Sequence, residues 1–286
     1  MNHTETIFLD RPVAMNPNQA LWEKGDFTRI AESMRESGED IVRQAGIAPG
    51  MKVLDLGCGD GTTAIPAAKL GADVLGVDIA SNLVAAGNRR AAQAGLSATC
   101  RFQQGDACDL GGIEDKSFDR VISIFGAMFA PRPFDVAREM VRVTRPGGRI
   151  VMGNWISNDP TLVAQILKIS ASYSPPPPEG FVSPMAWGST THVIERFGEA
   201  GIAWEGITCE RDSYVVNVDG SPAEFVDTFR RCDGPMMNAF DAAAKDGRTQ
   251  ALQSELVALF ESQNLCQYPG TTLIPATFLR VTVEVS

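Results

Sequence analysis

Short apolar runs alternate with longer amphipathic stretches in the middle of the chain. The runs that fit buried strands fall at 51–56, 73–77, 99–104, 120–125 and 149–154. Apolar residues at helical spacing separate several of them, as at 81–94 and 133–143. Strands that alternate with helices over short connections form parallel sheets covered by helices on both faces. The pattern therefore predicts an α/β fold for this region.

The two ends of the chain have different patterns. Residues 1–15 show no periodicity, whereas 16–46 carry apolar residues on one helical face up to the break at Pro49-Gly50. Beyond 154, helical stretches are expected at 162–170, 192–200 and 222–263, an extended segment at 175–178, and strands at 207–218 and 278–285. We expect one domain: a helical segment at 1–46 that covers a ligand, a ligand-binding core at 47–154, and a part at 155–286 that completes the sheet and caps the substrate site.

Composition narrows the class of protein. The chain has 286 residues and a net charge of −10, with no lysine- or arginine-rich block, which disfavours nucleic acid as a partner. The longest apolar stretch, 121–130, is shorter than the roughly 20 residues that cross a bilayer. The N-terminus lacks a basic-then-apolar run, so we expect no membrane contact and a cytoplasmic location. No C-x-x-C pair occurs and histidines number two, so no metal site is expected.

A glycine-rich turn follows the first predicted strand. It has the sequence DLGCGDG at 55–61 and lies where a strand gives way to a helix. Glycines allow such a turn to be sharp and bring backbone against a ligand, and the helix behind it offers unpaired N–H groups. Taken singly, a turn of this kind is a weak signal.

Carboxylates at the ends of the next two strands strengthen the evidence for a ligand site at this turn. Asp78 ends the second strand, where it can accept both hydroxyls of a ribose, and Asp106 follows the third, where it can receive the exocyclic amine of an adenine. Parallel strands open at one edge, so these groups converge. Asp55 would repel a pyrophosphate, and the spacing is Gly-x-Gly-x-Gly, so a cationic adenosyl ligand is favoured over a nicotinamide dinucleotide.

With these motifs in order, residues 51–154 resemble the core of class I S-adenosylmethionine-dependent methyltransferases, especially those of ubiquinone and menaquinone biosynthesis. The resemblance implies a Rossmann-like, seven-stranded, mostly parallel sheet whose last strand is antiparallel, and S-adenosylmethionine as the cofactor. It implies these cofactor-binding residues: Trp22, Phe27, Asp55, Leu56, Gly57, Gly59, Asp78, Ile79, Asp106, Ala107 and Phe125.

The resemblance also implies a role for each group. Asp55 and the two glycines would face the methionine end, Asp78 the ribose, and Ile79, Asp106 and Ala107 the adenine. Phe125 would lie near the transferring methyl group. Trp22 and Phe27 belong to the N-terminal segment that folds over the cofactor in related enzymes.

Candidates for the substrate pocket are aromatic and thioether side chains: Met128, Phe129, Trp155 and Trp187. Each is equally compatible with core packing. His192 is the candidate catalytic base, and its alternative role is to face solvent at the start of a helix. No Asn-Pro-Pro-Tyr type of sequence follows the fourth strand, which argues against methylation of adenine or glutamine.

These observations predict methyl transfer to the oxygen, nitrogen or carbon of a small hydrophobic or aromatic molecule, by a monomer or a homodimer. Two alternatives stay open at this point. One is a non-catalytic protein that binds S-adenosylmethionine, and the other is a methyltransferase acting on protein or RNA.

Overall fold

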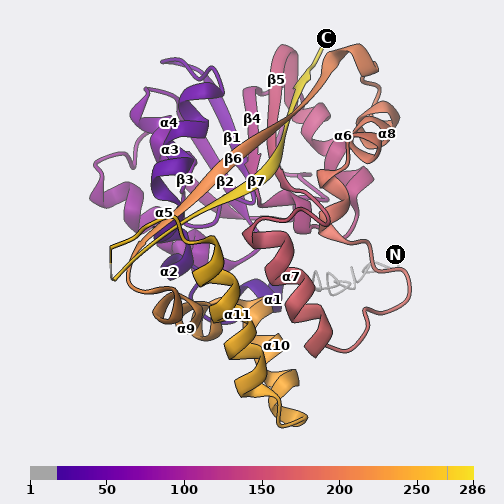
Figure 1. The fold of residues 1–286 in the computed structure, drawn as a ribbon. Helices are drawn as coiled ribbons and strands as arrows, with labels where there is room; N and C mark the ends of the chain where they lie inside the picture. The colour runs from indigo at the N-terminus through magenta and orange to yellow at the C-terminus, as the bar shows by residue number, and fades with distance from the viewer. Residues whose placement is uncertain (1–17, 269) are drawn as a thin grey trace, which may run out of the picture.

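A seven-stranded sheet organises the computed structural model, which describes residues 18–268 and 270–286 (Figure 1). The strands are β1 (Lys52–Leu56), β2 (Asp73–Asp78), β3 (Cys100–Gln104), β4 (Phe118–Ile124), β5 (Thr144–Trp155), β6 (Ile207–Asp219) and β7 (Thr271–Glu284). Their order is β3-β2-β1-β4-β5-β7-β6, and β7 is antiparallel to both of its neighbours. The predicted α/β class, Rossmann-like sheet and antiparallel last strand are confirmed. The segment 1–15, in which the sequence shows no periodicity, lies outside the described residues.

Helices cover both faces of the sheet. One face packs against α3 (Arg35–Gln44), α4 (Ala64–Lys69) and α5 (Ser81–Gln93), and the other against α6 (Pro133–Val143) and α8 (Thr190–Glu199). Neighbouring residues of β4 serve opposite cores, because side chains alternate along a strand: Val121 belongs to the larger core and Ile122 to the smaller one. Burial on both faces explains the apolar side chains of Val121 and Ile122 at neighbouring positions.

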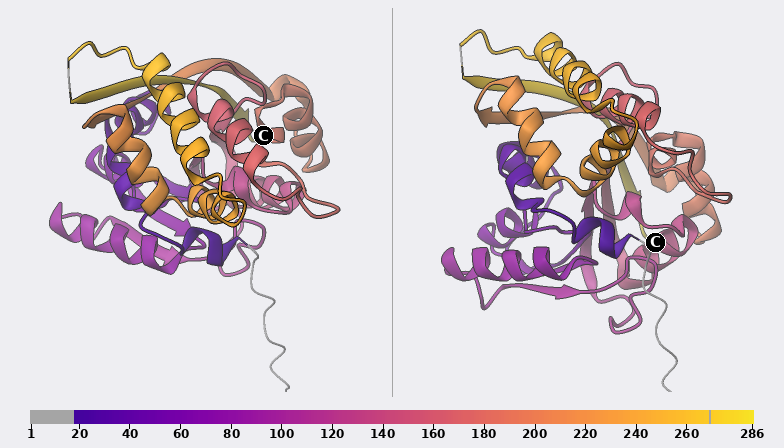
Figure 2. Two further views of the ribbon diagram at one scale, coloured as in Figure 1. Left: turned by 60° about the horizontal axis from the view of Figure 1, so that its bottom comes forward. Right: turned by 90° about the horizontal axis from the view of Figure 1, so that it is seen from below.

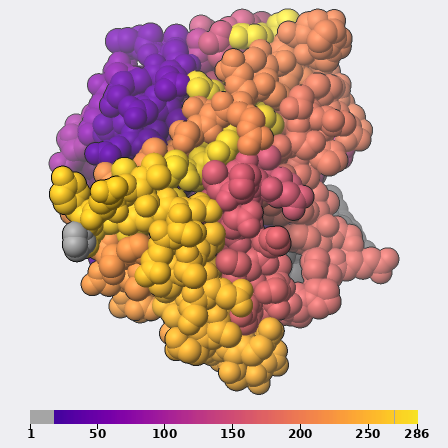
Figure 3. Space-filling view, viewed as in Figure 1, coloured from indigo at the N-terminus to yellow at the C-terminus, as the bar shows by residue number. Residues whose placement is uncertain are grey.

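A cap of four helices is built from two separate segments of the chain. It consists of α7 (Leu162–Tyr173), which follows β5, and of α9 (Pro222–Cys232), α10 (Gly234–Lys245) and α11 (Thr249–Gln263), which are inserted between β6 and β7. The four helices contact one another and lie together below the sheet in Figure 1. In Figure 2 the orange and yellow cap helices remain grouped, and in Figure 3 the yellow and crimson residues of the cap form the lower part of the face toward the viewer. The helical stretch expected at 222–263 is thus three helices.

The β6–β7 hairpin is longer than the sequence indicated. We expected the last strand at 278–285, but β7 begins at Thr271. Pro275, which cannot donate to a ladder, argues against a strand there. It is accommodated because this part of β7 pairs only with β6; pairing with β5 begins at Phe278.

The N-terminal segment is broken rather than continuous. It comprises α1 (Gln19–Trp22), α2 (Thr28–Ala31) and the short 3-10 turn η1 (Glu32–Met34) ahead of α3. The break falls at Gly25, whose φ of 80° is left-handed and whose Cβ, if present, would lie 2.6 Å from the carbonyl oxygen of Cys232. The β6–β7 hairpin holds the N-terminal segment in place, because the hydroxyl of Tyr214 donates to the carbonyl of Met34 at 2.7 Å.

Three further 3-10 turns complete the connections: η2 (Ala127–Phe129), η3 (Pro184–Gly188) and η4 (Trp204–Gly206). Among residues 18–268 and 270–286, no helix has the length and apolarity needed to cross a membrane.

Candidate active site

A cavity of about 240 Å³ lies between the carboxyl ends of the parallel strands, the cap and the N-terminal segment. The structure brings most of the expected cofactor residues to its wall: Trp22, Phe27, Leu56, Gly57, Gly59, Asp78, Ile79, Asp106, Ala107 and Phe125. Phe129 and Trp155, expected in the substrate pocket, line the same cavity. Asp55, Met128, Trp187 and His192 do not.

The glycine turn takes a backbone path that side chains would obstruct. Gly57 has φ of 70° and Gly59 φ of 54°, both in the left-handed region. The amide of Gly59 donates to Oδ2 of Asp78 at 2.8 Å, which ties the turn after β1 to the end of β2. The two strand ends therefore form one rigid edge of the cavity.

Asp78 is held in place by the backbone around it. Its Oδ1 accepts the amide of Ala80 at 2.9 Å, while Oδ2 accepts that of Gly59. Burial raises the pKa of this carboxyl, and the backbone N–H groups oppose the rise. The result is a fixed carboxylate in the cavity wall, where the ribose hydroxyls of an adenosyl group were expected.

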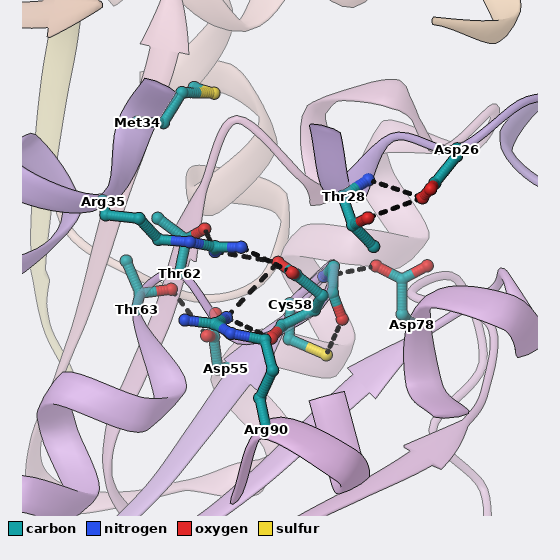
Figure 4. Close-up of polar contacts among 12 residues, drawn as sticks. Asp26, Thr28, Met34, Arg35, Asp55, Cys58, Thr62, Thr63, Asp78 and Arg90 are labelled. Atoms are coloured by element: carbon teal, nitrogen blue, oxygen red, sulfur yellow. Dashed lines mark hydrogen bonds and ion pairs between the residues drawn. The ribbon is translucent and has the colours of Figure 1, made fainter. Parts of the chain in front are cut away.

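Asp55 lies beneath the turn instead of facing the cavity, which corrects the expectation that it meets the methionine end. It is 1% exposed, and its Oδ2 accepts the hydroxyl of Thr63 at 2.6 Å (Figure 4). Its Oδ1 has no hydrogen-bond partner within the described chain. Burial raises the pKa of Asp55 to about 7. The alternation of β1 explains the placement, since the next residue, Leu56, lines the cavity.

Asp60 is a buried residue of the turn that the sequence analysis missed. Arg35 donates to both of its carboxylate oxygens, at 2.9 and 2.5 Å, and Arg90 approaches Oδ1 at 3.5 Å (Figure 4). Arg90 also donates to the carbonyl of Asp60 at 2.5 Å. Two helices, α3 and α5, thereby fix the loop that precedes α4. The signal available in the sequence was an acidic residue inside a glycine motif, without any indication of its partners.

Aromatic rings form the wall near the end of β4. Phe125, with φ of 57°, stacks on Trp155 with ring centres 3.6 Å apart and planes 8° apart. Tyr214 stands edge-on to Phe125 at 4.9 Å. Trp22 packs edge-on against Phe129, which also follows β4, at 4.9 Å, so the N-terminal segment contacts the cavity wall at this strand end.

Three expected site residues lie elsewhere. Met128 and Trp187 are each 1% exposed in the core, and Arg196 stacks over the Trp187 ring at 4.4 Å. Met128 and Trp187 therefore pack in the core, which is the alternative role that the sequence left open for them. His192 is exposed on α8, a helix that packs on α6 and contributes nothing to the cavity wall. The solvent-facing alternative describes His192.

The cap, the N-terminal segment and β6 supply wall residues that the sequence analysis did not identify. They are mostly apolar: Ile30, Met34, Leu162, Val163, Ile166, Leu167, Val216, Phe229 and Pro235, with Asn18, Ser33 and Asp233 as polar members. The wall residues on α7 follow helical spacing, which the sequence shows. The sequence does not show that this side of the helix faces the cavity.

The wall fits S-adenosylmethionine. Within the described part of the chain its ionisable side chains are Asp78, Asp106 and Asp233, and it has no lysine, arginine or histidine. Carboxylates suit a cationic sulfonium and ammonium, whereas a pyrophosphate would meet negative charge without a compensating base. Backbone at Gly57 and Gly59 is open to a ligand, and Ile79 offers an apolar contact beside Asp78.

Comparisons with known proteins agree with this fold. Residues 54–152 match a family model described as a methyltransferase domain. An uncharacterized protein of Mycobacterium tuberculosis is 33% identical over 252 residues, covering 87% of this chain and 89% of that protein. The methyltransferase GfsG of Streptomyces halstedii is 36% identical over 128 residues, 44% of this chain and 46% of that one.

A crystal structure of a putative methyltransferase from Bacillus halodurans covers 87% of this chain and 99% of its own, at a TM-score of 0.55 and 16% identity. The fold is that of a Rossmann-like methyltransferase. The chain belongs to the class I S-adenosylmethionine-dependent methyltransferases. Its cofactor is S-adenosylmethionine. The narrower resemblance to quinone-biosynthesis enzymes stays a prediction.

Proposed function

We propose that this methyltransferase acts on a small, predominantly apolar molecule, at an oxygen, nitrogen or carbon atom. The observation that carries the proposal is the cap side of the cavity, which is walled by apolar residues of α7 and α9, such as Leu162, Ile166, Leu167 and Phe229. Pockets with mostly apolar walls and few polar groups are typical of small-molecule sites.

Charge further limits the acceptor. Without a basic side chain in the described wall, a carboxylate or phosphate on the acceptor would be desolvated without a partner. A polynucleotide acceptor would also approach a chain whose net charge is −10. Neutral acceptors are therefore favoured.

S-adenosylmethionine, when bound, supplies a methyl group on a sulfonium sulfur that keeps the bonding electron pair on transfer. The protein binds the two reactants, aligns them and excludes water from the site. Asp78 and the turn at Gly57 hold one partner, while the cap walls hold the other. Alignment of two bound reactants can contribute on the order of 7–11 kcal/mol toward lowering the barrier.

The test is transfer of label from methyl-labelled S-adenosylmethionine to a panel of hydrophobic phenols, quinols and amines. We expect label in the organic extract, together with S-adenosylhomocysteine, and neither product with Asp78→Ala. Label transferred only to added protein or RNA would contradict the proposal. Binding of the cofactor without release of S-adenosylhomocysteine would support the non-catalytic alternative instead.

A further inference from the structure

The cap contributes one ionisable side chain to the described cavity wall, and it is Asp233. This residue joins α9 to α10 and is 9% exposed. Phe229, Pro235 and Leu167 line the same cavity. A carboxylate at this point is unexpected, because an apolar environment disfavours its charge.

Only one of the two carboxylate oxygens of Asp233 has a role in the fold. Oδ2 accepts the amide of Met236 at 2.9 Å and so caps the N-terminus of α10. Across residues 18–268 and 270–286, no hydrogen bond or ion pair reaches Oδ1. Burial raises the pKa of Asp233 to about 6.

The charged and titratable groups around Asp233 do not neutralise it. On α9 its neighbour is the thiol of Cys232, whose pKa is raised by burial and then by Asp26 of the N-terminal segment. Lys24, from the same segment, is paired with Asp241 of α10 at 2.7 Å. Asp233 is therefore a largely buried residue of the cavity wall whose Oδ1 has no hydrogen-bond partner in the described residues and is not fully enclosed by protein.

Capping alone does not account for this residue. Asparagine and serine cap helices about as well and carry no charge to bury. Oδ1 of Asp233 has no donor from the protein, and a ligand in the cavity with a hydroxyl group would supply one. Asp233 itself lies on the cap side, among the apolar residues assigned above to the acceptor.

We propose that Asp233 binds the hydroxyl group of the methyl acceptor, with its free oxygen accepting the O–H hydrogen bond. This inference rests on the proposed function and deepens it, because it identifies the acceptor as a neutral apolar molecule with a phenol- or enol-type hydroxyl. When that oxygen is methylated, its proton passes to Asp233. A carboxylate with pKa near 6 is ionised at neutral pH and is a stronger proton acceptor than an ordinary aspartate.

The first experiment measures binding and needs no turnover. The probes are 2-naphthol, which has a hydroxyl group, and 2-methoxynaphthalene, in which a methyl group replaces the hydroxyl hydrogen. Each is titrated into the complex of the protein with S-adenosylhomocysteine. We expect the wild type to bind 2-naphthol about tenfold more tightly than the ether, since hydrogen bonds to charged groups are among the stronger ones.

Asp233→Asn should remove that preference. Its amide oxygen can still cap α10, which directs the NH₂ group, a donor, toward the cavity. Affinity for S-adenosylhomocysteine should stay that of the wild type, and the unfolding temperature should not fall, because asparagine still caps α10 and carries no charge to bury. The control Asp246→Asn, an exposed change at the other end of α10 whose ion pair is with Arg248 and not with the N-terminal segment, should leave affinity, stability and the preference for 2-naphthol unchanged. Asp233→Ala serves as a second variant without either polar atom. Failure of the wild type to bind 2-naphthol, or equal preference in wild type and Asp233→Asn, would overturn the inference.

Turnover separates this inference from the proposed function. With a phenol that the wild type methylates, Asp233→Asn should lower kcat about 10²- to 10⁴-fold while leaving cofactor affinity unchanged. Unchanged kcat would overturn the role in proton acceptance. If the wild type methylates no small molecule yet distinguishes the two naphthalenes, the proposed function fails and the Asp233 site stands.

Discussion

Gly57 and Gly126 lie directly against each other where β1 and β4 end. A Cβ atom on Gly57 would come within 2.6 Å of Cα of Gly126, and one on Gly126 would overlap the carbonyl oxygen of Gly57. Backbone cannot yield to such a contact as the end of a flexible side chain can. Because both glycines line the cavity, this contact sets the distance between two of its walls.

Gly57→Ala should therefore be much more harmful than an alanine at another left-handed glycine. The matched control is Gly95→Ala, where φ is 71° and nothing lies within 4 Å of the added Cβ. We expect the control to lower the free energy of unfolding by about 1–2 kcal/mol, the cost of left-handed backbone. Gly57→Ala should add a further 1–3 kcal/mol or so from overpacking and weaken binding of S-adenosylhomocysteine. Urea unfolding and calorimetry measure both, and equal effects of the two variants would contradict the steric argument.

Asp55 should make stability depend on pH in a direction opposite to that of most carboxylates. Its pKa is about 7 in the folded protein, against an ordinary value of 3.8 for an aspartate exposed to water. Between these values the folded state holds more protons than the unfolded state, so the free energy of unfolding falls as pH rises. The stability that protonated Asp55 provides is complete below about pH 4 and is lost as pH rises through about 7.

Asp55→Asn removes this dependence while keeping an acceptor for Thr63. We expect the variant to gain on the wild type between about pH 5 and pH 8, by an amount on the order of a few kcal/mol. Urea unfolding of the ligand-free proteins at the two pH values gives the difference directly. A difference that stays constant across this range would show that Asp55 ionises freely in the folded state.

Arg35→Ala should destabilise the protein far more than the loss of an ordinary surface ion pair. It leaves Asp60, 2% exposed, without its two-point partner and with only the more distant Arg90. Leaving one partner of a buried pair uncompensated costs about 3–5 kcal/mol. Arg43→Ala on the same helix breaks exposed contacts with Glu39 and Asp40 and should cost less than about 1 kcal/mol.

Arg35→Lys tests the geometry of that pair, because an ammonium cannot donate along two parallel directions. We expect it to fall between wild type and alanine in urea unfolding. Stability equal to that of Arg43→Ala in all Arg35 variants would mean that Arg90 alone suffices.

The core of the fold was predictable because local patterns determine it. The runs at β1, β2, β4 and the second half of β5 are largely buried and bounded by turns, and the edge strand β3 alternates buried and exposed residues at its start, so periodicity located them. The strand-edge wall of the cavity followed from strand order, since parallel strands bring Gly57, Asp78 and Asp106 to one edge. Asp55 shows the limit of this reasoning: a motif gives the position of a residue along the strand, while the direction of its side chain depends on its partner Thr63.

The cap side of the cavity could not be predicted from such patterns. It is assembled from α7 and from helices inserted into a hairpin some sixty residues further along the chain, and no local signal states that they meet. His192 was a candidate base because the chain has few histidines. The rarity of a residue type gives no information about where that residue lies in the fold. Asp233 drew none, because an aspartate before a helix is ordinarily a cap.

The N-terminal segment should control cofactor affinity through the contact between Glu23 and Ser81. The carboxylate of Glu23 accepts both the amide and the hydroxyl of Ser81, at 3.1 and 2.8 Å, and the backbone bond from Ser81 is the main cause of its lowered pKa. This contact holds Trp22, one residue away, against the cavity beside the start of α5. Glu23→Ala should weaken binding of S-adenosylhomocysteine about two- to fivefold, a modest effect because the pair is exposed to solvent. Glu23→Gln keeps an acceptor for Ser81 and should retain most of the affinity; calorimetry that finds both variants equal to the wild type would show that the segment closes without this contact.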